Sequence, residues 1–213
     1  MLTPEALMIL SKRYLQASES PTDMFWRVAR YVAAAEEKYG YDTEEIAARY
    51  FRLLSSLMFL PNSPTLMNAG KPQAQLAACF VLPIEDSLTG IFETLKSAAL
   101  IQQSGGGTGF SFSRLRPRGD KIGTTGGTAS GPVPFIGIFD KATAVVRQGA
   151  VRQGANMAVL RVDHPDIRQF ITAKQDQAEL TNFNLSVGVT DQFMQAVQDG
   201  KEFALINPRT GSA

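Results

Sequence analysis

Hydrophobic residues in the first 60 positions recur every three or four residues, with polar residues between them. This spacing predicts amphipathic helices, and it occurs in three successive segments. Thr3 and Pro4 mark the start of the first helix, Ser20 the start of the second and Thr43 the start of the third. Residues 1–60 are therefore predicted to form an N-terminal helical region that serves packing or an interface.

After residue 60 the pattern changes to short apolar runs separated by stretches of helical periodicity. The segment 61–65, PNSPT, is predicted to be a rigid polar turn, and 67–70 to continue as a loop, because proline fixes φ and Asn and Ser bond to nearby backbone. Strands are predicted at 77–83, 110–113, 157–162, 183–189 and 203–206, and helices after Ser87, at 133–146, from Pro165 and at 193–197. This alternation is typical of parallel βα units. It predicts an α/β protein with domains at residues 1–60 and 61–213.

The stretch 76–109 joins the only cysteine to a run of three glycines through a predicted helix. Cys79 lies in the first apolar run, which is predicted to be a buried strand, and Asp86 or Ser87 caps the following helix. The glycines at 105–107 carry no Cβ and let a ligand approach backbone N–H groups. A lone buried thiol, however, is an inert small hydrophobe in most proteins. From these residues alone, a ligand loop and a tight packing corner are equal alternatives.

Other glycine and arginine motifs narrow the candidate chemistry. The run GGGTG at 105–109 follows a helix and enters a strand, which excludes the dinucleotide-binding fingerprint, and no Gly-Lys-Ser/Thr phosphate loop is present. Arginines stand at alternate positions from 114 to 118. They form either a solvated edge or a set of phosphate ligands, because guanidinium groups bind phosphate bidentately. A glycine-rich loop at 119–132 and a second Gly/Arg loop at 147–155 follow.

Composition restricts the class of protein. The 213 residues are 44% hydrophobic and 19% charged with a net charge of +1, so charge gives no reason to expect nucleic acid or an anionic membrane as a partner. No apolar run is long enough for a transmembrane helix, and no signal peptide is recognisable. One cysteine fits a reducing cytosol, and one cysteine with one histidine excludes a Cys/His zinc site. His164 is predicted to belong to a helix start, and the chain to be soluble and cytoplasmic, without a metal site.

Six motifs in order cover nearly the whole chain: PNSPTLMNAG, AACFVLPIEDSL, SGGGTGFSFSRLRPRGD, GGTASGPVPFIGIFD, RQGANMAVLRVDHPDI and NFNLSVGVTDQFM. Together they resemble the large catalytic chain of ribonucleotide reductase, most closely its adenosylcobalamin-dependent class II. The resemblance implies an N-terminal helical layer followed by the first part of a ten-stranded α/β barrel, incomplete in this chain. It also implies conversion of ribonucleotides to deoxyribonucleotides by thiyl-radical chemistry.

The resemblance further implies a set of substrate contacts. Cys79 matches the redox-active cysteine on the first barrel strand, whose partner cysteine is absent from this sequence. Ser63 matches a position whose hydroxyl helps to hold the substrate phosphate. Ala78, Gly106 and Gly107 match positions that, with Cys79, line the ribose and base.

An allosteric site for deoxynucleoside triphosphates is implied in the same way. Residues 119–131 match its first specificity loop and residues 147–156 its second. The second loop departs from relatives, which carry Arg-Arg-Gly where this chain has Arg-Gln-Gly at 152–154. The implied effector residues are Asp86, Ser87 and Leu88 for base and ribose, Arg116 for phosphate, and Lys96, Lys121 and Arg152 nearby.

The family's Asn-x-Cys-Gly-Glu loop, which carries the thiyl cysteine, is absent from this sequence. We therefore expect an N-terminal portion that is inactive without its C-terminal remainder and relies on that remainder to bind adenosylcobalamin. The expected partners are a ribonucleotide, dNTP or ATP effectors, the remainder of the reductase, a second copy in a homodimer, and a thioredoxin- or glutaredoxin-type reductant. Two alternatives stay open: the large subunit of a di-iron-dependent class I reductase, and a non-catalytic nucleotide-binding or assembly module.

Overall fold

The chain folds into two units, Met1–Ala78 and Cys79–Ala213, each with its own hydrophobic core. The computed structural model describes residues 2–72, 74–123, 126–146, 155–176 and 178–213. The first core gathers around Met24, and the second gathers around Phe110 and Phe139. Each unit therefore has the apolar packing of a domain.

Capping side chains begin the helices of the first unit. Thr3 accepts a hydrogen bond from the Ala6 amide at 3.2 Å, Ser20 forms a capping box with Asp23, and Asp42 accepts from two amides of the third helix. The three predicted helices are confirmed. They are α1 (Pro4–Arg13), α2 (Pro21–Ala33) and α3 (Thr43–Ser55), with a 3-10 helix, η1 (Ala34–Tyr39), between the last two.

The predicted turn at 61–65 and loop at 67–70 are wrong, because a short helix, α4 (Ser63–Asn68), occupies this segment. Asn62 Oδ1 accepts a hydrogen bond from the Thr65 amide at 2.9 Å and caps the helix. A proline lies in the first turn, where its missing N–H is not needed. Asn and Pro favour a helix start as well as a turn, so local preference did not separate the two.

Helix α4 packs on α2 and extends the first unit. Leu66 and Ala69 are buried in its core, and Arg27 of α2 donates to their carbonyl oxygens at 3.1 and 2.7 Å. Residues 61–78 thus fold with the helical unit, whereas the sequence placed them with the α/β domain. The difference arises because the packing of α4 on α2, which local sequence preferences do not reveal, decides the boundary.

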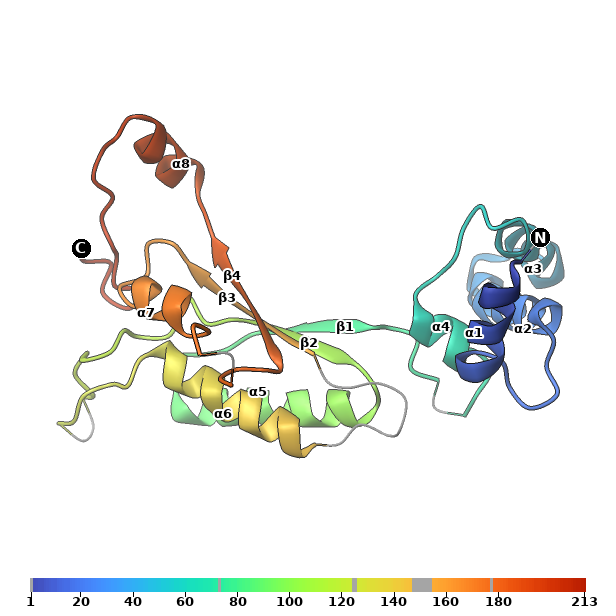
Figure 1. The fold of residues 1–213 in the computed structure, drawn as a ribbon, viewed down its shortest axis with the longest axis horizontal. Coiled ribbons are helices and arrows are strands. Elements are labelled where there is room, and N and C mark those ends of the chain that lie inside the picture. The colour runs from blue at the N-terminus through green and yellow to red at the C-terminus, as the bar shows by residue number, and fades with distance from the viewer. Residues whose placement is uncertain (1, 73, 124–125, 147–154, 177) are drawn as a thin grey trace. The chain divides into compact units, whose positions relative to one another are not determined.

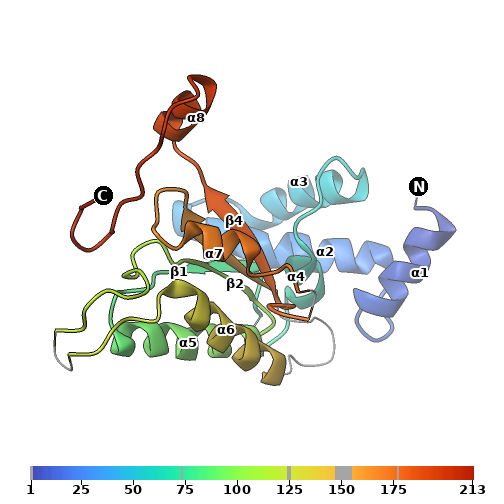
Figure 2. The same ribbon diagram turned by 60° about the vertical axis from the view of Figure 1, so that its left-hand side comes forward.

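A parallel four-stranded sheet forms the second unit, in the order β1-β2-β3-β4. Figures 1 and 2 show α5 and α6 side by side along one face of this sheet. The predicted parallel βα units are confirmed. The elements are β1 (Cys79–Leu82), α5 (Leu88–Gln103), β2 (Gly107–Ser111), α6 (Pro132–Val145), β3 (Asn156–Arg161), α7 (Ile167–Thr172), β4 (Phe183–Gly188) and α8 (Asp191–Gln198).

The two faces of the sheet differ in burial. Ala158 and Leu160 of β3 are completely buried on the helix side, whereas Met157, which precedes them in the strand, is 43% exposed. Val81 of β1 is 85% exposed. Since side chains alternate along a strand, Cys79 shares the open face with Val81. The prediction of a buried strand at Cys79 is therefore wrong: β1 pairs with β2 alone in the described chain, and Cys79 is exposed.

Two further expectations about the α/β unit are corrected. Residues 203–206 form no strand; Phe203 instead packs edge-to-face on Phe193 of α8, with ring centroids 5.1 Å apart. Helix α7 begins two residues after the predicted Pro165, because His164 and its neighbours form a turn first. Within the described residues, no helix is both long and apolar enough to cross a membrane.

Candidate functional site

The open face of the sheet places the only cysteine beside a strand rich in glycine. Cys79 of β1 and Gly107 of β2 are Cα partners, and Val81 and Gly109 are the next partners on the same face. A Cβ built on Gly109 would meet no heavy atom closer than 3.9 Å, so packing does not require glycine there. Gly107 itself is buried, and Gly109, two residues further along the same face, is partly exposed, so a ligand near the thiol can approach the backbone at Gly109.

The glycines before β2 have a different environment. A Cβ on Gly106 would lie 2.6 Å from Cγ2 of Ile101 and 2.8 Å from Cε2 of Phe80, and Gly105 has a φ of +89°. Both glycines allow the tight turn that joins α5 to β2. Of the two alternatives open from the sequence, the packing corner applies to Gly106. The predicted contact of Gly106 and Gly107 with substrate stays a prediction.

Two other predicted substrate residues lie in the helical unit. Ser63 is the first residue of α4, and its hydroxyl lies 3.0 Å from the phenol oxygen of Tyr14. Ala78 directly precedes β1. The structure gives their positions within that unit, and their role in binding stays a prediction.

A cavity of about 800 Å³ brings together four of the predicted effector residues. Asp86, Ser87 and Leu88 line it from the start of α5, and Arg116 lines it from the segment after β2. Arg116 donates through Nε to both carboxylate oxygens of Asp86, at 3.1 and 2.9 Å, and through Nη2 to the Asp86 carbonyl at 3.1 Å. These bonds fix the guanidinium at the wall of the cavity.

The glycine-rich loop supplies a second wall of the same cavity. Ile122, Gly123 and residues 128–131 line it, and a backbone bridge joins Lys121 to Thr128. Gly131 has a φ of +78°, and a Cβ there would lie 2.6 Å from Oδ2 of Asp166. The base of the loop is therefore closed tightly on the turn before α7.

Two further predicted effector residues, Lys96 and Lys121, do not line the cavity. Lys96 is exposed on α5 and pairs with Glu93 at 3.3 Å, three residues earlier. Lys121 is exposed and contributes backbone bonds to the loop. Arg152 lies outside the described residues, with most of the predicted second specificity loop.

Arg209 lines the cavity although no sequence feature indicated it. Its Nε and Nη2 donate to the two carboxylate oxygens of Asp120 at 2.9 and 2.6 Å. Burial raises the pKa of Asp120, but hydrogen bonds from Arg209 and Asn207 and the Arg209 charge outweigh it and hold that pKa below its ordinary value. Asp120 and Arg209 are 89 residues apart, so only the fold reveals the pair.

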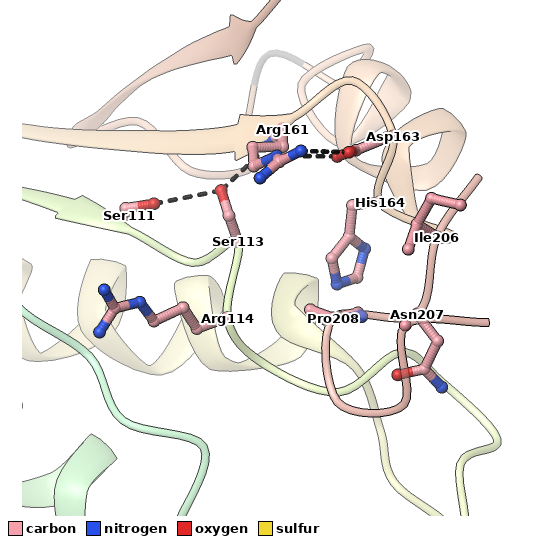
Figure 3. Close-up of a pocket in the computed structure, with 10 residues that line it drawn as sticks. Ser111, Ser113, Arg114, Arg161, Asp163, His164, Ile206, Asn207 and Pro208 are labelled. Atoms are coloured by element: carbon pink, nitrogen blue, oxygen red, sulfur yellow. Dashed lines mark hydrogen bonds and ion pairs between the residues drawn. The ribbon is translucent and has the colours of Figure 1, made fainter. Parts of the chain in front are cut away.

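A second cavity, of about 400 Å³, lies where β2 and β3 end (Figure 3). Many of its polar groups bond to one another. The Arg161 side chain pairs with Asp163, and the Arg161 amide donates a hydrogen bond to the Ser113 hydroxyl at 3.0 Å. His164 is buried, donates through Nε2 to the Leu115 carbonyl at 2.8 Å and accepts at Nδ1 from the Asp166 amide at 3.0 Å. The histidine thus joins two segments from the turn that precedes α7, rather than from the helix start to which the sequence assigned it.

Sequence reasoning also missed a buried polar network beneath the sheet. Gln102 Nε2 and the Thr108 hydroxyl donate to Asn156 Oδ1 at 2.9 and 2.6 Å, and Asn156 Nδ2 donates to the Thr143 hydroxyl at 2.7 Å. The four residues come from α5, β2, α6 and β3, and all are buried. One signal was present: Gln102 follows the buried Ala98 by four residues on the apolar face of α5.

Comparison with known proteins decides the family. Residues 77–213 match the family described as ribonucleotide reductase, barrel domain, and residues 1–74 match that described as ribonucleotide reductase, all-alpha domain. The chain belongs to the ribonucleotide reductase large-chain family. The predicted fold, a helical layer followed by the first part of the reductase α/β barrel, is thereby confirmed.

Individual relatives show how much of a reductase the chain spans. It is 53% identical to a vitamin B12-dependent ribonucleoside-diphosphate reductase of Mycobacterium tuberculosis, over 99% of this chain and 32% of that protein. It is 58% identical to a protein of the same name from Thermoplasma acidophilum, over 76% of this chain and 21% of that one. The fold matches the Actinobacillus ureae class Id ribonucleotide reductase alpha subunit with a TM-score of 0.78 and 23% identity, over 94% of this chain and 36% of that one. The chain therefore spans about a third or less of these relatives.

Proposed function

We propose that this chain carries the substrate-reducing cysteine and the effector-binding face of an adenosylcobalamin-dependent ribonucleotide reductase. One observation carries the proposal: in a chain of this family, Cys79 stands exposed on the open face of the sheet, in register with Gly107. The names of its relatives at 53% and 58% identity, which state vitamin B12 dependence, support the cobalamin class over the di-iron class.

In the proposed reaction Cys79 acts with a second cysteine supplied from outside this chain. The two thiols give up two electrons and two protons and become a disulfide, while the ribonucleotide loses its 2′-hydroxyl as water and gains hydrogen in its place. A thioredoxin- or glutaredoxin-type protein then reduces the disulfide by thiol exchange. Ser63 holds the substrate phosphate, and Ala78, Gly106 and Gly107 line its ribose and base. The open space around Gly109, on the same face as Cys79, supports this role, because the nearest heavy atom to a Cβ there would be 3.9 Å away.

The proposed effector is a deoxynucleoside triphosphate or ATP in the 800 Å³ cavity. Asp86, Ser87 and Leu88 contact its base and ribose, and Arg116 contacts phosphate; Lys96, Lys121 and Arg152 are proposed as outer contacts. The loops at 119–131 and 147–156 then transmit effector identity to the substrate site. Such coupling requires that the effector bind two arrangements of the loops with different affinity.

The described residues offer no group for the cobalt ion of the cofactor. His164, the only histidine of the sequence, has both ring nitrogens occupied by hydrogen bonds, and no three His, Cys, Asp or Glu side chains cluster among the described residues. Adenosylcobalamin supplies radical chemistry in enzymes that bind it. We propose that sequence outside this chain holds it and also supplies the thiyl cysteine.

The proposed partners follow from the same assignment. Besides the reductase remainder and its thiol reductant, we propose a second copy of the chain as partner in a homodimer. Exposed apolar side chains on the outer faces of two neighbouring helices support this: Leu88, Phe92 and Leu100 on α5, and Ile138 and Val145 on α6. The proposed reaction requires Cys79 as a free thiol, and thiols stay reduced in the cytoplasm, so we propose that compartment.

Reconstitution tests the proposed function. The chain is combined with the remaining two thirds of a B12-dependent reductase, and deoxynucleotide formation is measured with and without adenosylcobalamin. The proposal predicts product only with both parts and the cofactor. Product formed with a di-iron partner in place of cobalamin would instead support the class I alternative, and dNTP binding without any turnover would support a non-catalytic module.

A further inference from the structure

We propose that Arg209 is a second phosphate-binding residue of the effector cavity, held ready by its ion pair with Asp120. The inference rests on the proposed function, since it assigns a further contact to the effector site. No predicted motif includes Arg209, and its position follows from the fold alone. It reaches the wall of the cavity that Arg116 also lines.

The two arginines share one arrangement. Each uses Nε and Nη2 to bond an aspartate: Arg116 with Asp86, and Arg209 with Asp120. A guanidinium has five N–H donors, so each retains three, and within the described residues none of these has a protein acceptor. An arginine fixed by a carboxylate and left with free donors is suited to bind a phosphate bidentately.

Which member of the Arg209–Asp120 ion pair faces the cavity decides the sign of the charge there. Arg209 lines the cavity and its side chain is 39% exposed, whereas the side chain of Asp120 is 13% exposed and does not line it. The cation thus faces the cavity and the carboxylate lies behind it. An anion in the cavity meets the guanidinium first, and Asp120 orients it from the far side.

The turn that carries Arg209 is itself well fixed. Asn207 donates its amide to the Ser212 carbonyl at 2.8 Å and accepts from the Arg209 amide at 2.9 Å. The preceding Ile206 donates to the Asp163 carbonyl at 2.6 Å, which ties the turn to the end of β3. These bonds fix the backbone at Arg209, and the two bonds to Asp120 restrain its side chain, so less freedom is lost when a ligand binds, which favours affinity.

The ligand class follows from the charges. Two guanidinium groups, each paired with an aspartate, line one cavity. They match a ligand that carries more than one anionic group, as the adjacent phosphates of a nucleoside triphosphate do. A nucleoside monophosphate engages fewer of these donors. Arg209 is therefore expected to discriminate by phosphate number, while the contacts from the start of α5 read the nucleoside.

Two matched substitutions separate phosphate binding from loop support. Arg209→Gln and Asp120→Asn each break the same ion pair, but only Arg209→Gln removes a cation from the cavity. The affinities of the 213-residue chain for dATP, dCTP, dGTP, dTTP and the matching monophosphates are measured by calorimetry at two salt concentrations. Thermal melts of both variants measure whether loss of the ion pair lowers stability by the same amount in each.

The inference predicts that Arg209→Gln weakens triphosphate binding about tenfold or more, weakens monophosphate binding less, and lowers the salt dependence. Asp120→Asn keeps the cation in the cavity and removes only the carboxylate that orients it, so it should weaken triphosphate binding by a smaller factor, about threefold; Arg209→Lys should recover part of the loss seen in Arg209→Gln. Equal losses in Arg209→Gln and Asp120→Asn, or no loss in Arg209→Gln, would overturn the inference and leave the proposed function standing. A wild-type chain that binds none of the four triphosphates would overturn the effector assignment and the inference together.

Discussion

Cys79 and Gly107 are Cα partners across the first two strands of the parallel sheet. The cysteine therefore lies on the sheet's open face beside a residue without a side chain, and its thiol is exposed. A redox cysteine requires this access twice, once for the substrate and once for the protein that reduces it again.

Exposure of Cys79 is directly measurable, because the chain has no other cysteine. We predict that iodoacetamide labels the folded chain once, at a rate that urea increases little. Intact-mass spectrometry over time in both conditions measures this. A thiol that reacts only after unfolding would contradict the exposed position at the start of β1.

Two glycines of one motif should respond differently to the same substitution. Gly106→Ala places a Cβ 2.6 Å from Ile101 and 2.8 Å from Phe80 and should destabilise the fold by about 1–3 kcal/mol. Gly109→Ala meets no atom closer than 3.9 Å and should leave stability unchanged or raise it by up to about 1 kcal/mol. Urea denaturation of both variants measures the difference.

Gly109→Ala, which should not lower stability, is expected to affect substrate binding. Gly109→Ala adds a methyl group to the open face near Cys79, so in the reconstituted enzyme it should raise KM while the fold stays intact. Equal stability losses at both glycines would show that the packing described around Gly106 is not specific to that position.

The buried polar network should show strong coupling between Gln102 and Asn156. Gln102→Leu and Asn156→Leu each leave buried partners without a hydrogen bond and should destabilise by about 1–3 kcal/mol. The double variant removes both and should lose at least about 1 kcal/mol less than the sum. Gln103→Leu, on the exposed side of α5, is the control and should change stability by no more than about 0.5 kcal/mol. Additive losses would argue against a shared network.

The ion pair between Glu19 and Arg27 should make the helical unit sensitive to acid. Burial raises the pKa of Glu19, but hydrogen bonds from Arg27 and the Gln16 amide, together with the Arg27 charge, hold it below its ordinary value of 4.5. Because the folded pKa is the lower one, the stabilisation is present above about pH 4.5 and is lost as pH falls through the folded pKa. Melts of wild type and Glu19→Gln between pH 3 and 7 should converge at the acid end.

Arg27 also holds the carbonyl oxygens of α4, so its removal should be costly. Arg27→Ala is predicted to destabilise the helical unit by about 3 kcal/mol, since it leaves Glu19 buried without its partner. The exposed pair Arg30–Glu44 serves as the control, and Glu44→Gln should change stability by less than about 1 kcal/mol. Similar effects at both pairs would contradict the role assigned to Arg27.

Local chemistry explains which parts of the fold could be predicted from the sequence. Thr3, Ser20 and Ser87 begin helices in the structure because their side-chain oxygens accept hydrogen bonds from free amides of the first turn, a preference that each short segment carries by itself. Helix α4 escaped prediction because Asn62 and the proline after it suit a turn equally well.

Features that depend on distant partners could not be predicted. The exposure of Cys79 depends on which strands flank β1, and the apolar run around it is compatible with either burial. The pairing of Arg209 with Asp120 across 89 residues leaves no trace in composition or periodicity. In contrast, Asp86 and Arg116 came together as the family resemblance implied, although their contact with an effector stays a prediction.

The central claim is that Cys79 supplies reducing electrons to the substrate, and a single-turnover experiment tests it most directly. The chain, reduced and combined with the remaining reductase sequence and adenosylcobalamin, is given ribonucleotide without any external reductant. We predict about one equivalent of deoxynucleotide per active site, with disulfide formation at Cys79, and none from Cys79→Ser of unchanged stability. The same yield from Cys79→Ser as from wild type would contradict the account.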